Sequence, residues 1–366
     1  MNAELFDPTA MIDDLRALVE VESPSHDRAA LQRSAEVLAA VIERRTGRPA
    51  QLIDGPAGPH VHWRGSDDAK VLILGHHDTV FPLGALAQRP FTVADGHATG
   101  PGVFDMAAGI VQAVHAVASL GDNPAVEMLF TCDEEVGSLT SRALLEERAR
   151  ACGAVLVLEP SGDGGALKTG RKGTGTFTVT VTGKAAHAGL EPHRGVNSLI
   201  EAAHQVLTIA ALADAEVGTT VTPTVVSGGT ADNVVPAETT VRVDVRVTCD
   251  EERQRIEEAM AALYAVNPAA TVTVTGAIGR PPMPESASAE LFPLAQQFDP
   301  SIDGVAVGGG SDGNFTAAIG VPTLDGLGAV GGGAHADHEY IVVDTMADRA
   351  RLVAAIVSAR CALTAA

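Results

Sequence analysis

The sequence lacks the features that nucleic-acid-binding, membrane-spanning and disulfide-stabilised proteins need. Its 25 basic residues face 46 acidic ones, for a formal net charge of -21, which argues against nucleic acid or an anionic membrane as a partner. No stretch approaches the roughly 20 apolar residues of a membrane span. The N-terminal residues show no basic region followed by an apolar run, so we expect a cytoplasmic protein.

Cysteine is also scarce, and no two cysteines form a C-x-x-C pair. This spacing favours reduced thiols in the core over a disulfide framework or a thiolate metal site. The four residues are Cys132, Cys152, Cys249 and Cys361.

What the chain does have is length and apolar content for two domains. It is 366 residues long and 46% hydrophobic, which suits two cores, one of them inserted into the other. Alternating Thr and Val segments and two helical patterns predict the order β-α-β-β-α-β, the ferredoxin-like split unit, in the middle of the chain. We therefore expect residues 1–173 and 279–366 to form one domain in two segments. Residues 174–278 would form an inserted domain, entered and left through linkers rich in Gly and Pro.

The segment from Val71 to Asp78 reads Val-Leu-Ile-Leu-Gly-His-His-Asp. Its apolar run predicts a buried parallel strand, and the polar residues follow where that strand should end, at the edge where α/β sheets place their chemistry. Alternation directs His76 and Asp78 to one side, so that one can bind a metal while the other orients it. Alone, the pair would more often be a core histidine beside a capping Asp.

Four more segments bring a His or a carboxylate to an expected strand end or glycine turn. They are Gly100-Pro-Gly-Val-Phe-Asp105, the run Val126–Thr131 followed by Asp133-Glu134-Glu135, the run Ala154–Leu158 followed by Glu159, and the run Ile319–Leu324 leading to Gly-Ala-His335. A mixed imidazole and carboxylate set is typical of Zn²⁺ or a similar divalent ion, and five ligands suit two ions.

Two ions about 3.5 to 4 Å apart need a bridging carboxylate and activate water at neutral pH. Asp105 is the natural bridge, because Gly100 and Gly102 allow a tight turn beneath it. Glu134 and Glu135 are adjacent and point in different directions, so one can bind metal while the other acts as general base. A solvated helix start and plain glycine turns would explain these motifs separately, but not their shared position at strand ends.

These motifs resemble, in order, the signatures of the di-zinc exopeptidase family of glutamate carboxypeptidase, aminoacylase and acetylornithine deacetylase. The resemblance spans nearly the whole chain, including Gly183-Lys-Ala-Ala-His187-Ala-Gly and Asn233-Val-Val-Pro. It implies an α/β fold with a mixed, mostly parallel sheet flanked by helices, plus a lid and dimerisation domain. It also implies the site roles: one zinc on His76, Asp105 and Glu159, a second on Asp105, Glu135 and His335, Asp78 orienting His76, and Glu134 as base.

In the inserted domain the resemblance implies that His187 helps to stabilise the transition state and that Arg246 binds a substrate carboxylate, with Asn233 as a further contact. It also implies a homodimer through this domain. The sequence departs from the family at Ala107-Ala108, where relatives often have a Lys.

The expected function is a zinc-dependent hydrolase that cleaves an amide bond next to a free carboxylate in a small peptide or N-acyl amino acid. Two Zn²⁺ per chain are expected, with Co²⁺ or Mn²⁺ as alternatives. The glutamate carboxypeptidase type is favoured because Thr169-Gly-Arg-Lys-Gly-Thr-Gly and the stretch from His187 to Asn197 look closest to it. An N-acyl amino acid deacylase is the alternative within the class. A catalytically silent dimeric binding protein is the alternative from another class, although every ligand position and the base are filled.

Overall fold

The computed structural model describes residues 6–365, which divide into two compact units. The first unit holds the described residues up to Gly170, Pro284–Val307 and those from Ser311 onward, and the second holds Arg171–Met283 and Gly308–Gly310. No helix within residues 6–365 is long and apolar enough to cross a membrane. The N-terminal five residues, on which the expected absence of a leader partly rests, lie outside the described range, and the cytoplasmic location stays a prediction.

The first unit is built on a six-stranded sheet in which most neighbours are parallel. Strands β6, β3, β7 and β14 run parallel, while β1 and β2 add an antiparallel edge, in the order β1-β2-β6-β3-β7-β14. This confirms the predicted fold class. The strands are β1 (Gln51–Asp54), β2 (Pro59–Arg64), β3 (Val71–His76), β6 (Val126–Thr131), β7 (Val155–Val157) and β14 (Thr323–Leu324).

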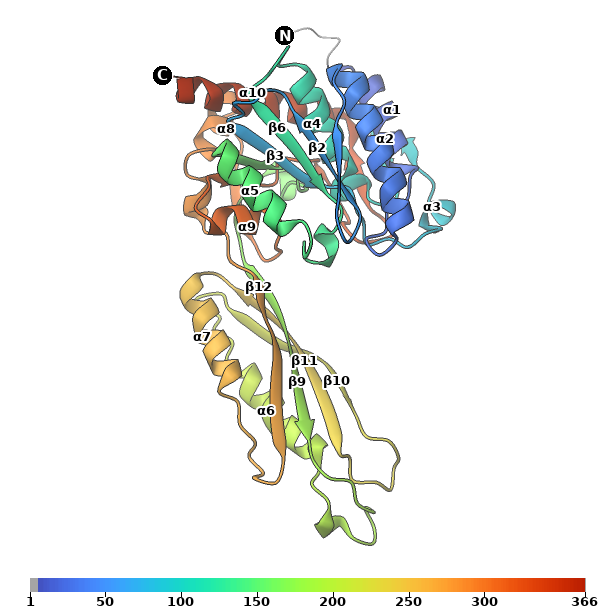
Figure 1. Ribbon diagram of the computed structural model, residues 1–366, viewed down its shortest axis with the longest axis vertical. Coiled ribbons are helices and arrows are strands. Elements are labelled where there is room, and N and C mark those ends of the chain that lie inside the picture. The colour runs from blue at the N-terminus through green and yellow to red at the C-terminus, as the bar shows by residue number, and fades with distance from the viewer. Residues whose placement is uncertain (1–5, 366) are drawn as a thin grey trace. The chain divides into compact units, whose positions relative to one another are not determined.

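Helices cover both faces of this sheet, which is why β3 is a continuous apolar run. Ile73 packs into a core shared with α1 (Pro8–Val19), α2 (Arg28–Thr46), α4 (Ala108–Ala118) and α10 (Met346–Ala365). Leu72 and Leu74 pack into a second core with α5 (Arg142–Cys152) and α9 (Gly313–Ala318). Figure 1 shows α5 on the opposite side of the sheet from α10. Burial on both faces leaves only the strand ends for polar chemistry.

Smaller elements complete the first unit. A four-stranded sheet has the order β15-β16-β5-β4, and β8 pairs with β13. The elements are α3 (Ala85–Gln88), β4 (Thr92–Ala94), β5 (His97–Thr99), β8 (Leu167–Arg171), α8 (Phe292–Phe298), β13 (Gly304–Val307), β15 (Gly331–Gly332) and β16 (Tyr340–Val342). The apolar run Ile319–Leu324 forms only the short β14, because Gly320 adopts a positive φ of 79° and Pro322 follows it.

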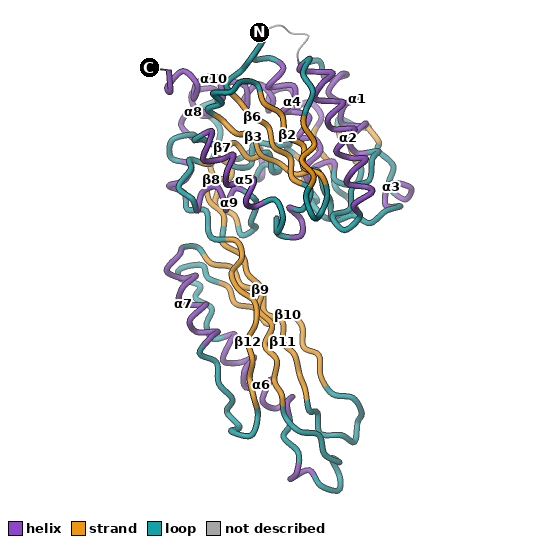
Figure 2. Tube along the Cα trace, viewed as in Figure 1, coloured by secondary structure: helices purple, strands orange, loops and turns teal. Residues whose placement is uncertain are grey.

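The second unit follows the predicted β-α-β-β-α-β order. Its four strands form an antiparallel sheet in the order β10-β11-β9-β12, and α6 and α7 pack their apolar sides on one face of it (Figure 2). This order and pairing are those of the ferredoxin-like unit. The elements are β9 (Gly173–Thr182), α6 (Ser198–Ala210), β10 (Thr220–Gly228), β11 (Glu238–Val247), α7 (Asp250–Ala261) and β12 (Thr271–Arg280).

Paired strands extend into the Gly-rich segments at which the chain enters and leaves this unit. Within residues 170–175, β8 ends and β9 begins, and β12 continues to Arg280. A Cβ on Gly175 would lie 2.6 Å from the Cα of Ile278, and one on Gly173 would lie 2.8 Å from the nitrogen of Pro282. These glycines therefore permit close backbone approach.

Candidate metal centre

His76 ends β3 and faces two carboxylates. Its Nε2 lies 3.2 Å from Oδ1 of Asp105 and 3.6 Å from Oε1 of Glu159. Its Nδ1 lies 3.0 Å from the backbone oxygen of Asp78 and 3.4 Å from Oδ1 of the same residue. His76, Asp105 and Glu159 thus form one group whose ligand atoms all lie within 4.8 Å of one another.

A second group shares Asp105 with the first. Nε2 of His335 lies 3.4 Å from Oδ2 of Asp105 and 3.1 Å from Oε2 of Glu135. Asp105 therefore presents Oδ1 to one imidazole and Oδ2 to the other, which is the arrangement of a carboxylate that bridges two metal ions. Imidazole and carboxylate donors in two groups with one shared member fit a pair of divalent ions.

The turn that presents Asp105 is held by a residue that sequence reasoning missed. Gly102 has a φ of 72°, and a Cβ there would lie 2.6 Å from Cγ2 of Thr79. The buried carboxylate of Glu339 accepts hydrogen bonds from the backbone N–H groups of Gly102 (3.0 Å), Phe104 (2.8 Å) and Asp105 (2.9 Å). Burial raises the pKa of Glu339 to about 7 against the lowering effect of these bonds.

Asp78 links the histidine to the adjacent glutamates. Besides facing His76, its fully buried carboxylate accepts hydrogen bonds from the hydroxyl of Ser25 (2.7 Å) and from the backbone N–H groups of Glu134 and Glu135 (3.2 Å each). Glu135 belongs to the second ligand group, while Glu134 belongs to neither. The carboxylate of Asp78 thus positions both His76, at the end of β3, and the segment after β6 that carries Glu134 and Glu135.

The electrostatics of the site favour positive charge. Burial acts to lower the pKa of His76, but hydrogen bonds with Asp105 and Asp78 outweigh it and hold the pKa well above the usual value. Hydrogen bonds with Asp105 and Glu135 raise the pKa of His335 to about 10. Burial raises the pKa of Glu135. Carboxylates that lie this close together need positive charge beside them. In the absence of metal the protonated imidazoles supply it, and bound divalent ions would supply it in their place.

Two of the remaining predicted site residues meet in the second unit. Nδ1 of the exposed His187 accepts hydrogen bonds of 3.1 Å from the N–H groups of Gly189 and Leu190, so a neutral imidazole carries its proton on Nε2. The N–H of Ala188 donates to the backbone oxygen of Asn233 at 2.8 Å. His187 and Asn233 are therefore neighbours, and His187 is set up as a hydrogen-bond donor.

Arg246 lies on β11 of the same unit but at the other end of the sheet. Its Nε and Nη2 bond the carboxylate of Asp244 at 3.0 and 2.9 Å. Arg246 pairs with Thr174 near the start of β9, whereas the chain reaches His187 only after the end of β9. At roughly 3.3 Å per residue along the strand, this separates Arg246 from His187 and Asn233 by about 25 Å or more.

The mostly parallel α/β sheet, with two ligand groups sharing one carboxylate at its strand ends, is the arrangement of a metallohydrolase with a dinuclear metal centre. Comparisons with known proteins agree. Residues 169–272 match the peptidase dimerisation domain, and residues 60–197 match peptidase family M28. Carboxypeptidase G2 of Pseudomonas sp. (strain RS-16) is 30% identical over 371 residues, covering 95% of this chain and 88% of the relative.

Two further comparisons extend this result. Succinyl-diaminopimelate desuccinylase of Psychrobacter sp. (strain PRwf-1) is 29% identical, over 85% of this chain and 83% of the relative. The M20 family metallo-carboxypeptidase of Sulfolobus solfataricus has the same fold, with a TM-score of 0.73 at 17% identity over 98% of this chain and 99% of that one. The chain belongs to the M20 family of metallopeptidases, which confirms the family predicted from its motifs.

Proposed function

We propose that this protein is a zinc-dependent hydrolase that cleaves an amide bond next to a free carboxylate and releases a C-terminal amino acid, with glutamate as the first candidate. The observation that carries the proposal is the position of Asp105 between two ligand groups, with Glu134 beside the second of them. The relatives named above include a carboxypeptidase and a desuccinylase. Measured substrate specificity would distinguish these two reaction types.

We assign one Zn²⁺ to His76, Asp105 and Glu159 and the other to Asp105, Glu135 and His335, and we expect Co²⁺ or Mn²⁺ to substitute. When bound, such a pair of ions lowers the pKa of water and polarises the carbonyl of the scissile bond. The ligand set supports this choice because it contains nitrogen and oxygen donors of the type that zinc accepts.

Glu134 is the proposed general base and acid. Its backbone N–H is held by Asp78, and it directly precedes a ligand of the second group. In this role Glu134 takes the proton of the attacking water and delivers it to the leaving nitrogen, so that the amine departs neutral. Asp78 is proposed to position two residues of the site, because it holds the backbone of Glu134 and also orients His76.

Arg246 is the proposed anchor for the substrate carboxylate. Asp244 holds its Nε and Nη2, and Nη1 has no hydrogen-bond partner within the described part of the chain. The guanidinium is planar and pre-oriented by this pair, a geometry that favours recognition of a carboxylate and that Lys cannot copy.

His187 and Asn233 are proposed to act on a substrate held by the neighbouring subunit. The separation of about 25 Å along β9 is too long for Arg246 and His187 of one chain to contact the same small substrate. In a dimer, each subunit would place its His187 and Asn233 at the substrate that Arg246 of the other subunit binds. His187 would then donate from Nε2 to the oxyanion that develops on the scissile carbonyl, with Asn233 beside it.

The exposed apolar residues of the second unit support a homodimer through this unit. On α6, Leu199, Ile200 and Leu207 have exposed fractions of 47%, 61% and 72%, and on β10 Val225 and Val226 are 50% and 51% exposed. β10 is an edge strand, with backbone groups open for pairing. A second copy would cover this surface, as expected for a dimerisation domain.

The test is a screen of dipeptides and N-acyl amino acids with the zinc-loaded protein, monitored by release of the free amine. Hydrolysis of peptides or N-acyl compounds ending in glutamate supports the carboxypeptidase assignment, and cleavage only of short acyl groups such as acetyl or succinyl supports the deacylase alternative. Arg246→Lys should lower kcat/KM for substrate acids but have little effect on the matching amides. Equal loss for acids and amides would contradict the role of Arg246.

A further inference from the structure

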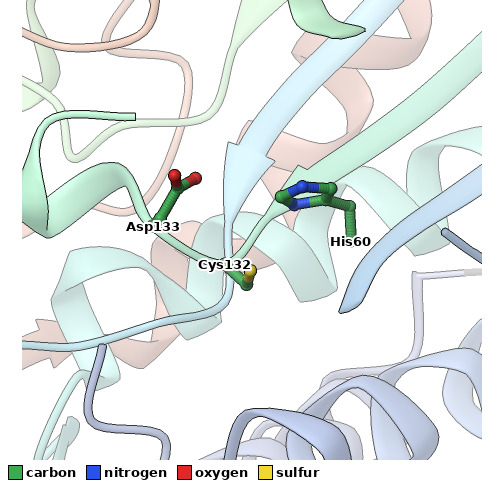
Figure 3. Close-up of side chains that lie close together, drawn as sticks. All are labelled: His60, Cys132 and Asp133. Carbon is green, nitrogen blue, oxygen red and sulfur yellow. The ribbon is translucent and has the colours of Figure 1, made fainter. Parts of the chain in front are cut away.

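A third cluster of potential metal ligands lies outside the dinuclear centre. His60 on β2 and Cys132 and Asp133 after β6 each offer one ligand atom, and these atoms lie within 4.8 Å of one another. The exposed fractions of the three residues are 2%, 0% and 1%. Figure 3 shows the imidazole of His60 and the carboxylate of Asp133 on either side of Cys132.

Within residues 6–365, two buried polar atoms in this cluster have no hydrogen-bond partner. They are Nδ1 of His60 and Oδ1 of Asp133. The other carboxylate oxygen of Asp133 is satisfied, because the N–H and the hydroxyl of Thr140 donate to it at 2.7 and 2.8 Å. Buried polar atoms are nearly always paired, so two unpaired atoms in one cluster call for a ligand. Burial also lowers the pKa of His60 and keeps the imidazole neutral, the form that binds metals.

We propose that His60, Cys132 and Asp133 form a third cation site, selective for a thiophilic divalent ion such as Zn²⁺ or Cd²⁺. One nitrogen, one sulfur and one oxygen donor make up a ligand set that Zn²⁺ accepts, and the thiolate favours it over Mg²⁺ or Ca²⁺. Tetrahedral bonds of ordinary length place ligand atoms roughly 3.5 Å apart, so side chains already within 4.8 Å need only a small shift. Water can complete the fourth position.

The chemistry of binding is a simple exchange. Burial raises the pKa of Cys132 to about 12, so the thiol is protonated before the ion arrives. The ion replaces that proton on sulfur, and the proton leaves to solvent. No oxidant or reductant is needed.

The position of the site gives it a structural consequence. Asp133 directly precedes Glu134 and Glu135, while His60 belongs to β2, the strand paired with β6 on the side away from β3. An ion held by all three side chains would tie β2 to the start of the segment that carries both glutamates. We therefore expect the third ion to raise the melting temperature of the protein, because it binds only the folded chain tightly.

A Cd²⁺ titration of the full-length protein tests the site, because Cd–thiolate bonds give an ultraviolet charge-transfer band that nitrogen and oxygen ligands do not. The dinuclear centre has no sulfur ligand, so its two ions contribute no such band. The wild type should bind three Cd²⁺ and show one thiolate band. Cys132→Ala should bind two and show none. Cys152→Ala, which removes another buried thiol with a pKa of about 12, should behave like the wild type.

A second variant guards against a folding defect in Cys132→Ala. His60→Gln retains the thiol and should keep a weakened band, with an affinity lowered at least tenfold. Absence of any thiolate band in the Cd²⁺-saturated wild type would overturn the proposal and leave buried water as the partner of the unpaired atoms. A band that persists in Cys132→Ala would overturn it as well, because the thiolate would then belong to another cysteine.

Discussion

The carboxylate of Glu339 accepts a 2.9 Å hydrogen bond from the backbone N–H of Asp105, the residue shared by the two ligand groups. The same carboxylate holds the N–H groups of Gly102 and Phe104. Glu339 therefore holds the backbone of the turn at residues 102–105, and the side chain of Asp105 faces the imidazoles of His76 and His335. The orientation of the bridging ligand depends on a residue more than two hundred positions further along the chain.

Glu339→Gln should weaken metal binding by about 10- to 100-fold, because an amide has one acceptor oxygen in place of two, so at least one of the three N–H groups loses its acceptor and Asp105 is less well oriented. Competition with a chromophoric chelator measures this affinity. The matched control is Asp337→Asn, whose side chain is 94% exposed and lies two residues away. Unchanged metal affinity in Glu339→Gln would show that the turn holds its shape without this carboxylate.

Substitutions of the adjacent Glu134 and Glu135 should have different effects on catalysis and on metal binding. Glu134→Gln is expected to lose about 10² to 10⁴ in kcat while retaining its metal, because it lacks the proton shuttle but no ligand. Glu135→Gln should lose metal affinity, because it replaces a carboxylate ligand of the second group with a neutral amide. Steady-state kinetics and metal analysis of both variants decide the matter. The reverse pattern would mean that the two roles are exchanged.

Mixing two inactive variants tests the composite site. His187→Ala should lose about 10² to 10³ in kcat, because the oxyanion loses one hydrogen-bond donor. An equal mixture with Glu134→Gln, after subunit exchange, should recover about a quarter of wild-type activity, since half of the dimers are mixed and each has one intact site. If exchange is verified by a tag on one variant and no activity returns, His187 does not act across the interface.

Glu127 should contribute to acid stability. Burial acts to raise its pKa, but hydrogen bonds with His62 and Arg148 outweigh it and lower the pKa from 4.5 to about 2. Its ionised form therefore stabilises the fold above about pH 4.5, and that contribution, about 3 kcal/mol, disappears as the pH falls toward 2. Urea unfolding at a series of pH values should show a flatter acid limb for Glu127→Gln. Glu290→Gln, with a side chain 60% exposed, is the control. If the free energy of unfolding falls equally with pH in the wild type and in Glu127→Gln, the role of Glu127 is contradicted.

Local pattern was enough to find the strand ends of the catalytic unit. The apolar run before His76 and the run before Glu134 are each buried on both faces of one sheet, so hydrophobic length alone predicts where the polar edge begins. The same reasoning predicted the order of elements in the second unit, where Thr and Val alternate. Such signals are local, because strand period and burial are properties of a few consecutive residues.

The supporting contacts could not be predicted this way. Nothing in the run His-Ala-Asp-His-Glu distinguishes the buried Glu339 from the exposed Asp337, because only the pairing of β16 with β5 brings the former beneath the turn at Asp105. The cluster of His60 and Cys132 depends likewise on the pairing of β2 with β6. The glycines near Gly175 permit two strands to pack closely, which their local sequence does not show. Each of these features arises from long-range pairing that local periodicity does not encode.

The most direct test of the central claim is the rate of amine release from a cleaved substrate, before and after complete removal of metal by a chelator. Clustered His and carboxylate ligands predict that the metal-free protein is inactive and that Zn²⁺ or Co²⁺ restores the rate. Circular dichroism should confirm that the metal-free chain stays folded. A full rate of hydrolysis in protein shown to contain no metal would contradict the account.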